Sequence, residues 1–296
     1  MADRAARLSF VVLVGLGTSL GSVGTLPARA AEGLPPAIPA AGVCTLRLPV
    51  ETFTMRSAVL DETRRINVYT PPGYAANAEA RFPVLYLPDG GLEEDFPHVA
   101  EAVHSGIAWG ILRPLLVVGI ENTERRRDMT GETTVAKDRE IAPRVGGSAA
   151  FRRFLREELV PLVQARWRTS DEAAIMGESL AGLFVLETFF LEPDLFDAYV
   201  AIDPSVWWND RQLARGAAER LRARPDLEKA LYLATAGVED IVAGTEAIAR
   251  ALAEHAPPGL VWQHHPMPDE FHDTIYRASA PRALRTLFAA TPPPAP

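Results

Sequence analysis

The sequence predicts an α/β fold in which a mostly parallel central sheet is covered by helices on both faces. Two observations carry this prediction. Short, uninterrupted apolar runs typical of buried strands recur along the chain, and segments with helical periodicity separate them. This alternation favours a parallel sheet, because each helical crossover returns the chain to the same edge. The length of 296 residues, 48% of them hydrophobic, suits one large domain.

The first half of the chain supplies the first strands. LRLPVETFTM and RRINVYT have strand character, and Pro71, Pro72 and Gly73 end the second stretch. FPVLYLPDGG indicates a buried strand, residues 96–110 can form a helix, and RPLLVVGIEN indicates the next strand. The polar segment 122–147 is too long for a routine connection. It is therefore either a functional surface loop or a solvated run of charges.

The second half alternates more regularly. Helical periodicity returns at Ser148, a favourable N-cap, and continues to Val163. The expected elements after it are the strand AAIMG, a helix from near Leu180, the strand AYVAID, a helix over 210–223, the strand ALYLATAG, a helix over 240–255, the strand LVWQHHP and a helix over 279–290.

The first thirty residues differ from the rest of the chain. Arg4 and Arg7 precede the uncharged apolar stretch LSFVVLVGLGTSLGSVG, and Ala28-Arg29-Ala30 follows it. This pattern predicts a signal peptide over residues 1–30, cleaved after Ala30, and hence a periplasmic or secreted protein. An uncleaved membrane anchor is the alternative, because the stretch is just long enough to span a bilayer. We then expect an extended leader over 31–45, the folded domain over 46–290 and a flexible tail over 291–296.

The charge of the chain narrows its partners. A net charge of -8 and a pI of about 5.4 offer no basic field for nucleic acid or anionic lipid, so we expect a small-molecule partner and no membrane contact beyond export. The chain has one cysteine, Cys44, so its core and not intramolecular disulfides must hold it together. No pattern in the sequence indicates an oligomeric state.

The stretch IMGESLAGLF, residues 175–184, carries the first chemical signal. Ser179 stands between a predicted buried strand and a predicted helix, with small residues at Gly177, Ala181 and Gly182. This is the context of a nucleophile elbow, a turn so tight that large neighbours would strike the strand or the helix. At the start of a helix, free N–H groups favour developing negative charge beside the serine. The alternative is an ordinary N-cap serine.

A serine nucleophile needs a base, which we expect later in the chain. His272 stands in PDEFHDTIY, on a polar loop between the last predicted strand and the last helix, where its ring can reach the sheet edge. We therefore expect His272 to be the catalytic base. The other histidines precede the serine or fall within predicted helices and strands: His98, His104, His255, His264 and His265.

Three carboxylates could orient the histidine. Asp240 is preferred, because it follows Gly237 at the carboxyl edge of the strand ALYLATA. Glu239 is adjacent to it, and Asp203 also ends a strand, so both remain alternatives. Each of the three could instead cap a helix.

An oxyanion hole would use the backbone N–H of Leu180 and a second one from the loop after FPVLYL, for which Gly91 is the candidate. A plain glycine turn is the alternative for Gly91. Chemistry of this kind requires no metal and no organic cofactor, and the sequence gives no metal-binding spacing around His264 and His265.

Several segments together carry a family resemblance. PPGY, FPVLYLPDGG, VVGIEN, GESLAGLFVLETFFLEPDLFDAYVAIDPSVWW and FHDTIYRASAPRAL resemble esterases of the α/β-hydrolase superfamily, in the branch that contains the bacterial ferri-siderophore (enterobactin and bacillibactin) esterases. The likeness spans about residues 50–290. It implies an α/β-hydrolase fold in a single esterase domain, with Ser179 as nucleophile, His272 as base, and Asp240 or its neighbour as the acid.

The chain departs from the family pattern at two places. Asp203 stands where the family usually has the first serine of Ser-Pro-Ser, which leaves the choice of acid open. Glu178 replaces the usual histidine before the nucleophile and puts a carboxylate close to the site. By the same resemblance, Trp207, Trp208 and the segment 122–147 with Arg127 are the candidates for holding a bulky aromatic or catecholate ester. The tryptophan pair could instead belong to the core.

These features predict a serine carboxylic-ester hydrolase that works through an acyl-enzyme, acting on ferri-siderophore (catecholate trilactone) or related esters. An acyltransferase that uses a sugar or lipid alcohol in place of water is one alternative. A non-catalytic siderophore- or glycan-binding protein is the other.

Overall fold

The computed structural model describes residues 48–237 and 239–290, without the side chains of Glu239 and Asp240. The predicted signal peptide, leader and tail lie outside these ranges. Of the expected folded domain, residues 46, 47 and 238 lie outside them too.

The described part of the chain contains one eight-stranded sheet with the order β1-β2-β4-β3-β5-β6-β7-β8. β1 and β2 form an antiparallel hairpin, and β2 is also antiparallel to β4. All pairs from β4–β3 to β7–β8 are parallel. The predicted fold class is therefore confirmed. The strands are β1 Val50–Ser57, β2 Glu62–Tyr69, β3 Phe82–Pro88, β4 Leu116–Ile120, β5 Thr169–Glu178, β6 Ala198–Ile202, β7 Ala230–Ala236 and β8 Val261–Met267.

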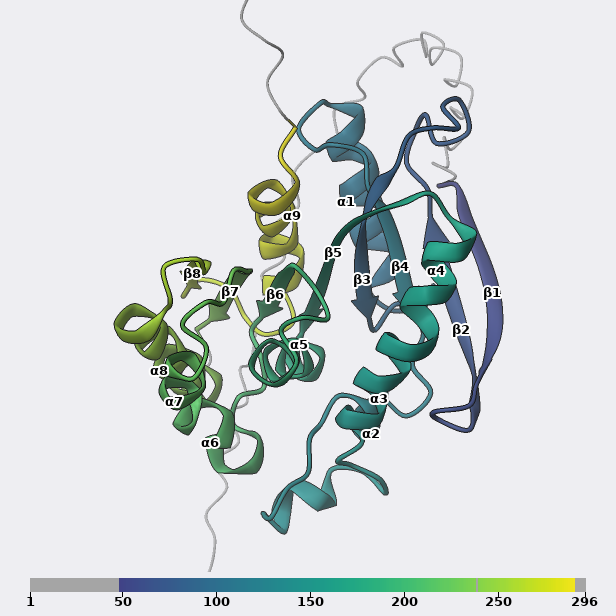
Figure 1. Cartoon of the computed structure of the whole chain (residues 1–296). Coiled ribbons are helices and arrows are strands. Elements are labelled where there is room, and N and C mark those ends of the chain that lie inside the picture. Colours follow the sequence, from purple (N-terminus) through teal and green to yellow (C-terminus); the bar gives the residue numbers. More distant parts are fainter. Residues whose placement is uncertain (1–47, 238, 291–296) are drawn as a thin grey trace, which may run out of the picture. The chain divides into compact units, whose positions relative to one another are not determined.

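Helices cover both faces of the sheet (Figure 1). α1 (Phe96–Ala108) and α9 (Ile275–Phe288) pack on one face, and the helices from α3 to α8 pack on the other. Along β3, Val84 and Tyr86 belong to one core cluster and Leu85 and Leu87 to the opposite one, because successive side chains of a strand point to opposite faces. Burial on both sides is why these strands are apolar runs without polar alternation.

The remaining helices occupy the expected places with shifted ends, except that the single helix expected over 210–223 is two helices, Trp208–Arg215 and Ala217–Arg222, separated by Gly216. The helix expected from Ser148 to Val163 contains a π-helical turn next to Pro161, which lacks the N–H that an α-helical bond would need. The segment 122–147 holds two short helices. The elements are α2 Arg125–Asp128, η1 Lys137–Glu140, α3 Ser148–Phe154, η2 Leu155–Leu159, α4 Val160–Arg166, α5 Ser179–Leu191, α6 Trp208–Arg215, α7 Ala217–Arg222 and α8 Glu239–His255.

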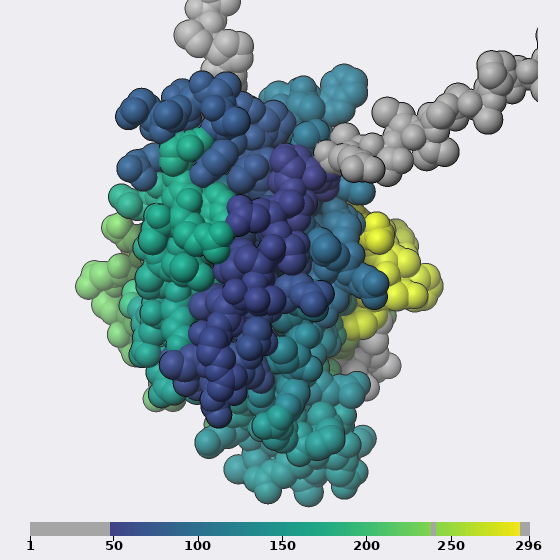
Figure 2. Space-filling model, turned by 90° about the vertical axis from the view of Figure 1, so that its right-hand side faces the viewer, coloured from purple at the N-terminus to yellow at the C-terminus, as the bar shows by residue number. Residues whose placement is uncertain are grey.

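β1 forms one edge of the sheet and runs down the face seen in Figure 2, where it is purple, beside the teal segment of α3 and α4. Charged side chains such as Glu51 and Arg56 are exposed along it, as is usual where a strand edge has no neighbour. None of the helices within the described ranges combines the length and the apolar composition needed to cross a membrane.

Candidate active site

Ser179 sits on a strained turn between β5 and α5. Its φ is 59°, in the left-handed region that residues with a side chain rarely adopt. A Cβ at Gly177 would lie 2.7 Å from the backbone carbonyl carbon of Ala181, so only glycine fits there. At Gly182 a Cβ would lie 3.1 Å from the carbonyl oxygen of Ile202. Close backbone contacts thus require glycine at position 177 and leave little room at position 182, and the predicted strand–turn–helix geometry is present.

A continuous hydrogen-bond chain begins at this serine. Nε2 of His272 lies 3.0 Å from Ser179 Oγ, and Nδ1 of the same ring lies 2.5 Å from Asp203 Oδ2. Asp203 is fully buried, and its Oδ1 accepts a 2.9 Å hydrogen bond from the backbone N–H of Ala236. Residues 93 positions apart are therefore in direct contact through their side chains.

The carboxylate on the histidine is Asp203, and the preference for Asp240 is corrected accordingly. β6 pairs directly with β5, and Glu178 is paired with Ile202, so Asp203 follows β6 beside the position where Ser179 follows β5. Glu239 and Asp240 begin α8 after β7, one strand further from β5. Their side chains lie outside the described part of the structure, and Asp203 already occupies the Nδ1 position that either would need.

His264 and His265, the two histidines on β8, make local contacts. Nε2 of His264 lies 2.8 Å from Thr235 Oγ1, and His265 stacks on Tyr232 with ring centroids 4.7 Å apart. These two histidines bond and pack against neighbours of β7 and β8, as expected for structural residues.

The site is rich in carboxyl groups whose proton affinity is altered. The hydrogen bond that His272 donates to Asp203 raises the pKa of His272, against the opposing effect of burial, and the charge of Glu178 raises this pKa further. Burial raises the pKa of Glu178 to about 7, with a further contribution from Asp95. Burial also raises the pKa of Asp95 to about 7, helped by the charge of Asp89. The site therefore contains several groups that change charge near neutral pH.

The two expected oxyanion donors, Leu180 and Gly91, lie in different surroundings. Leu180 is the second residue of α5, where N–H groups have no helical carbonyl partner. The Gly91 N–H instead donates a 2.7 Å hydrogen bond to Glu94 Oε2. Its assignment as the second donor is corrected for this conformation, because a carboxylate occupies the amide.

The arginine whose charge acts on His272 and Glu178 is Arg125, which the sequence did not single out. Its Nε and Nη2 donate hydrogen bonds of 2.8 and 2.7 Å to the two carboxylate oxygens of Asp89, and its charge acts on both His272 and Glu178. Arg127, the expected substrate-binding residue, bonds Glu62 with two nitrogens and Asp128 with its Nε. The structure thus gives Arg127 a place in a network that holds α2 against β2.

The tryptophan pair, Trp207 and Trp208, follows Asp203 closely in the sequence. Ser205 donates its N–H to the carbonyl of Ser179 at 2.9 Å, and the hydroxyl oxygens of the two serines are 3.4 Å apart. Trp208 is buried, and its indole N–H donates to the carbonyl of Gly131 at 3.0 Å, which ties α6 to the 122–147 segment. Trp207 is half-buried and borders a separate hollow with Lys137 and Ile141.

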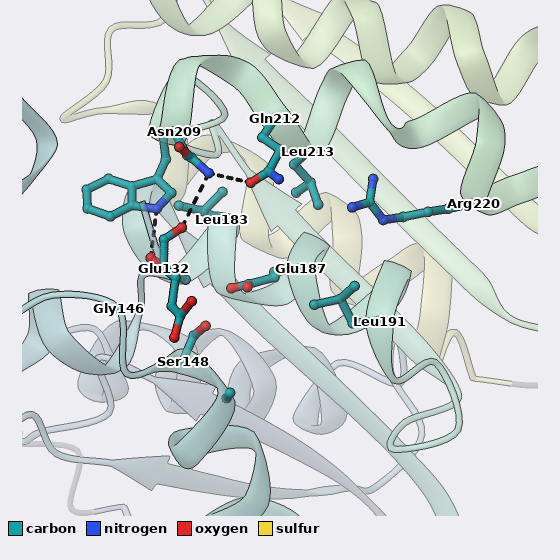
Figure 3. A pocket seen from close by; sticks show the side chains of 13 residues that line it. Glu132, Gly146, Ser148, Leu183, Glu187, Leu191, Asn209, Gln212, Leu213 and Arg220 are labelled. Atoms are coloured by element: carbon teal, nitrogen blue, oxygen red, sulfur yellow. Dashed lines mark hydrogen bonds between the residues drawn. The ribbon is translucent and has the colours of Figure 1, made fainter. Parts of the chain in front are cut away.

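A cavity of about 330 Å³ lies on the far part of α5, between that helix, the 122–147 segment and α6 (Figure 3). Trp208, Leu183, Glu187 and Ser148 are among its lining residues. None of the lining residues belongs to the hydrogen-bond chain of Ser179, His272 and Asp203.

Glu178, Asp203 and His272 each offer one atom of a kind that binds metal ions, and these atoms lie within 4.8 Å of one another. Both ring nitrogens of His272 already have hydrogen-bond partners, and Asp203 accepts bonds with both oxygens. We therefore interpret the group as a proton-transfer site.

Comparisons with known proteins agree with this geometry. A family model described as "Putative esterase" matches residues 57–241. The chain is 31% identical over 165 residues to the ferri-bacillibactin esterase BesA of Bacillus subtilis, covering 50% of this chain and 56% of BesA. It is 33% identical over 137 residues to a siderophore triacetylfusarinine C esterase of Aspergillus fumigatus, covering 43% of this chain and 45% of that protein. The chain thus spans about half the length of these curated relatives.

A solved structure extends the likeness to most of the described fold. An IroE-like serine hydrolase from Shewanella oneidensis superimposes with a TM-score of 0.74 and 28% identity, covering 81% of this chain and 80% of that one. The match to the family model covers more than half of the sequence and includes β2 to β7 with the serine turn. The fold described above is an α/β-hydrolase fold, and the chain belongs to this family of esterases.

Proposed function

We propose that this protein is a serine carboxylic-ester hydrolase that works through an acyl-enzyme, with Ser179 as nucleophile, His272 as base and Asp203 as the acid. The observation that carries the proposal is the hydrogen-bond chain from Ser179 Oγ through both nitrogens of His272 to the buried Asp203. An unperturbed serine hydroxyl is a weak nucleophile, and such a chain supplies the base and its orientation.

The geometry supports a specific division of roles. With Nδ1–H donated to Asp203, the lone pair of Nε2 faces Ser179 Oγ and can take its proton as Oγ attacks the ester carbonyl. In this proposal the Leu180 N–H, at the start of α5, donates to the negative oxygen of the tetrahedral intermediate. Protonated Nε2 then gives its proton to the leaving alcohol. Water, activated by the same nitrogen, hydrolyses the acyl-enzyme and restores the serine.

The substrate class follows from the relatives and not from the site alone. Two relatives are named as esterases, one of ferri-bacillibactin and one of the siderophore triacetylfusarinine C. We therefore propose that the substrate is an ester of a siderophore or a compound of that kind. The basic and apolar pattern of residues 1–30 further supports export to the periplasm or the medium.

The test is a panel of substrates measured on the wild type and on Ser179→Ala. The panel contains aryl esters, feruloylated and acetylated sugars, and iron-loaded siderophores closed by ester bonds. We expect the wild type to hydrolyse siderophore esters and Ser179→Ala to lose turnover.

The same panel separates the alternatives. Transfer of the acyl group to an added sugar or lipid alcohol in preference to water would replace the hydrolase by an acyltransferase. Saturable binding of iron-loaded siderophore without turnover in either protein would replace the enzyme by a binding protein.

A further inference from the structure

A second carboxyl group contacts the same nitrogen that faces the serine. Glu178 Oε1 lies 3.3 Å from Nε2 of His272, which is also 3.0 Å from Ser179 Oγ. The Glu178 side chain is 15% exposed, and its Oε1 has no hydrogen-bond partner among the described residues. A buried oxygen without a partner is uncommon, and here it faces a ring nitrogen that the reaction uses.

Among the residues that the structure describes, no arginine forms an ion pair with this carboxyl. The charged and titratable groups that act on Glu178 are His272, Asp95, Arg125 and Asp203. Arg125 is the cation among them with a permanent charge, and its guanidinium bonds both oxygens of Asp89. Burial, Asp95 and Asp203 all favour the protonated form of Glu178, whereas His272 and Arg125 favour the charged form.

The contact permits few protonation states. A neutral His272 that donates Nδ1–H to Asp203 presents a lone pair at Nε2, and an ionised Glu178 presents another 3.3 Å away. Two acceptors without a proton between them repel each other. One proton removes the repulsion, whether a protonated Glu178 donates to Nε2 or a protonated Nε2 donates to Glu178. In both states Nε2 cannot accept the proton of Ser179.

We propose that Glu178 and His272 hold one proton between them, and that this proton must leave before His272 can activate Ser179. Glu178 acts through the histidine and is a positioning residue for the proton. The inference rests on the proposed function, since it concerns the same base. It implies that activity rises at a higher pH than it would with a neutral side chain at position 178.

The experiment measures how fast a fluorophosphonate probe labels Ser179 as the pH is varied from about 5 to about 9. This probe requires an activated serine and no siderophore ester, so it reports on the base independently of the substrate. Glu178→Gln preserves the shape of the side chain and removes its charge. We expect the pH midpoint of labelling to fall by roughly one unit or more in Glu178→Gln, because an anion beside the imidazolium is lost.

The chain offers a closely matched control in Glu187. Glu187 lies on the same helix as Ser179, is 16% exposed, and also has a buried oxygen without a hydrogen bond. It lines the cavity of Figure 3. Its ion-pair partner is Arg152 at 3.3 Å. We expect Glu187→Gln to keep the wild-type midpoint. Ser179→Ala provides the unlabelled baseline.

Each outcome has one meaning. A Glu178→Gln midpoint equal to that of the wild type overturns the inference and leaves the serine hydrolase standing. Failure of the probe to label the wild type at any pH overturns both. Labelling with the expected shift but without hydrolysis of siderophore esters supports the inference and means that the substrate is a different ester.

A measurement on the wild type protects the test against a variant that does not fold. The imidazole resonances of His272 are followed by NMR through the same pH range. We expect them to titrate above the ordinary histidine range and in two steps, as in a coupled pair. A single step at the ordinary histidine value contradicts the shared proton.

Discussion

Glu178 and Ile202 are paired across β5 and β6, and this register places the next residues of the two strands, Ser179 and Asp203, at the same edge of the sheet. Both of these residues have positive φ, 59° for Ser179 and 42° for Asp203. The chain turns sharply at the end of each strand, and the side chains reach His272 from two sides. The geometry of the site is thus a direct consequence of strand pairing.

From this register we expect Asp203, and not Asp240, to be the carboxylate that activity requires. Asp203→Asn removes the acceptor that fixes Nδ1–H and supports the imidazolium, so we expect kcat to fall by about three to four powers of ten. Asp240→Asn is the matched control and should retain activity close to that of the wild type. Steady-state kinetics on an aryl ester compare the two. A severe loss in Asp240→Asn with a mild one in Asp203→Asn would reinstate the original preference.

The sequence was sufficient to predict the fold class, which follows from the alternation of strands and helices. It also predicted that Ser179 and His272 lie close together, because each stands in a motif that follows a strand. It could not select the acid, since Asp203 and Asp240 each follow a parallel strand and only the strand order separates them. Gly91 failed as a free donor because Glu94, three residues later, folds back onto its amide. Such a contact depends on a side-chain conformation and leaves no sequence pattern.

The sequence could not distinguish Arg125 from Arg127 for a similar reason, because the difference lies in where each side chain points. Arg125, Arg126 and Arg127 are consecutive on the short helix α2. Residues two positions apart on a helix point about 200° away from each other. Arg125 therefore reaches Asp89 near the site while Arg127 reaches Glu62 on β2. Three identical neighbours in sequence carry no information about which one faces the site.

The backbone contact at Gly177 predicts a loss of both stability and activity on adding one methyl group. In Gly177→Ala, the new Cβ would meet backbone atoms of Ala181 at 2.7 Å, so α5 must shift and Ser179 with it. We expect a destabilisation of about 1–3 kcal/mol and a fall in kcat. Urea unfolding and ester hydrolysis measure the two effects.

Gly106→Ala is the control for this substitution. Its Cβ would meet Cδ1 and Cγ of the buried Leu112 side chain at 2.6 and 2.7 Å, in the core on the face of the sheet opposite α5, so the crowding there does not involve the turn at Ser179. We expect kcat to stay at the wild-type level. Equal losses of kcat in the two variants would mean that crowding at the elbow is not the cause.

From the contacts of Arg127 we expect its removal to lower the free energy of unfolding and to leave KM unchanged. Its guanidinium bonds Glu62 at 3.0 and 2.7 Å and Asp128 at 2.7 Å, and Asp128 is fully buried. Arg127→Ala removes these bonds and leaves the two carboxylates with Arg64, so we expect the free energy of unfolding to fall by about 1–3 kcal/mol. KM should not change. Arg126→Ala, which removes an exposed bond to the carbonyl of Ile141, should be nearly neutral. A raised KM with unchanged stability in Arg127→Ala would restore its role in substrate binding.

Asp95 predicts that stability decreases as the pH rises towards neutrality. Its side chain occupies the N-cap position of α1 but makes no capping hydrogen bond, and burial raises its pKa from 3.8 to about 7. A carboxyl with a raised pKa binds more protons in the folded than in the unfolded state between these two values. The folded state therefore loses stability as the pH rises from about 4 to about 7, by a few kcal/mol at most. Asp95→Asn cannot ionise and should lose less stability over this range. Urea unfolding at several pH values compares the two proteins, and parallel curves would show that Asp95 does not ionise differently in the folded and unfolded states.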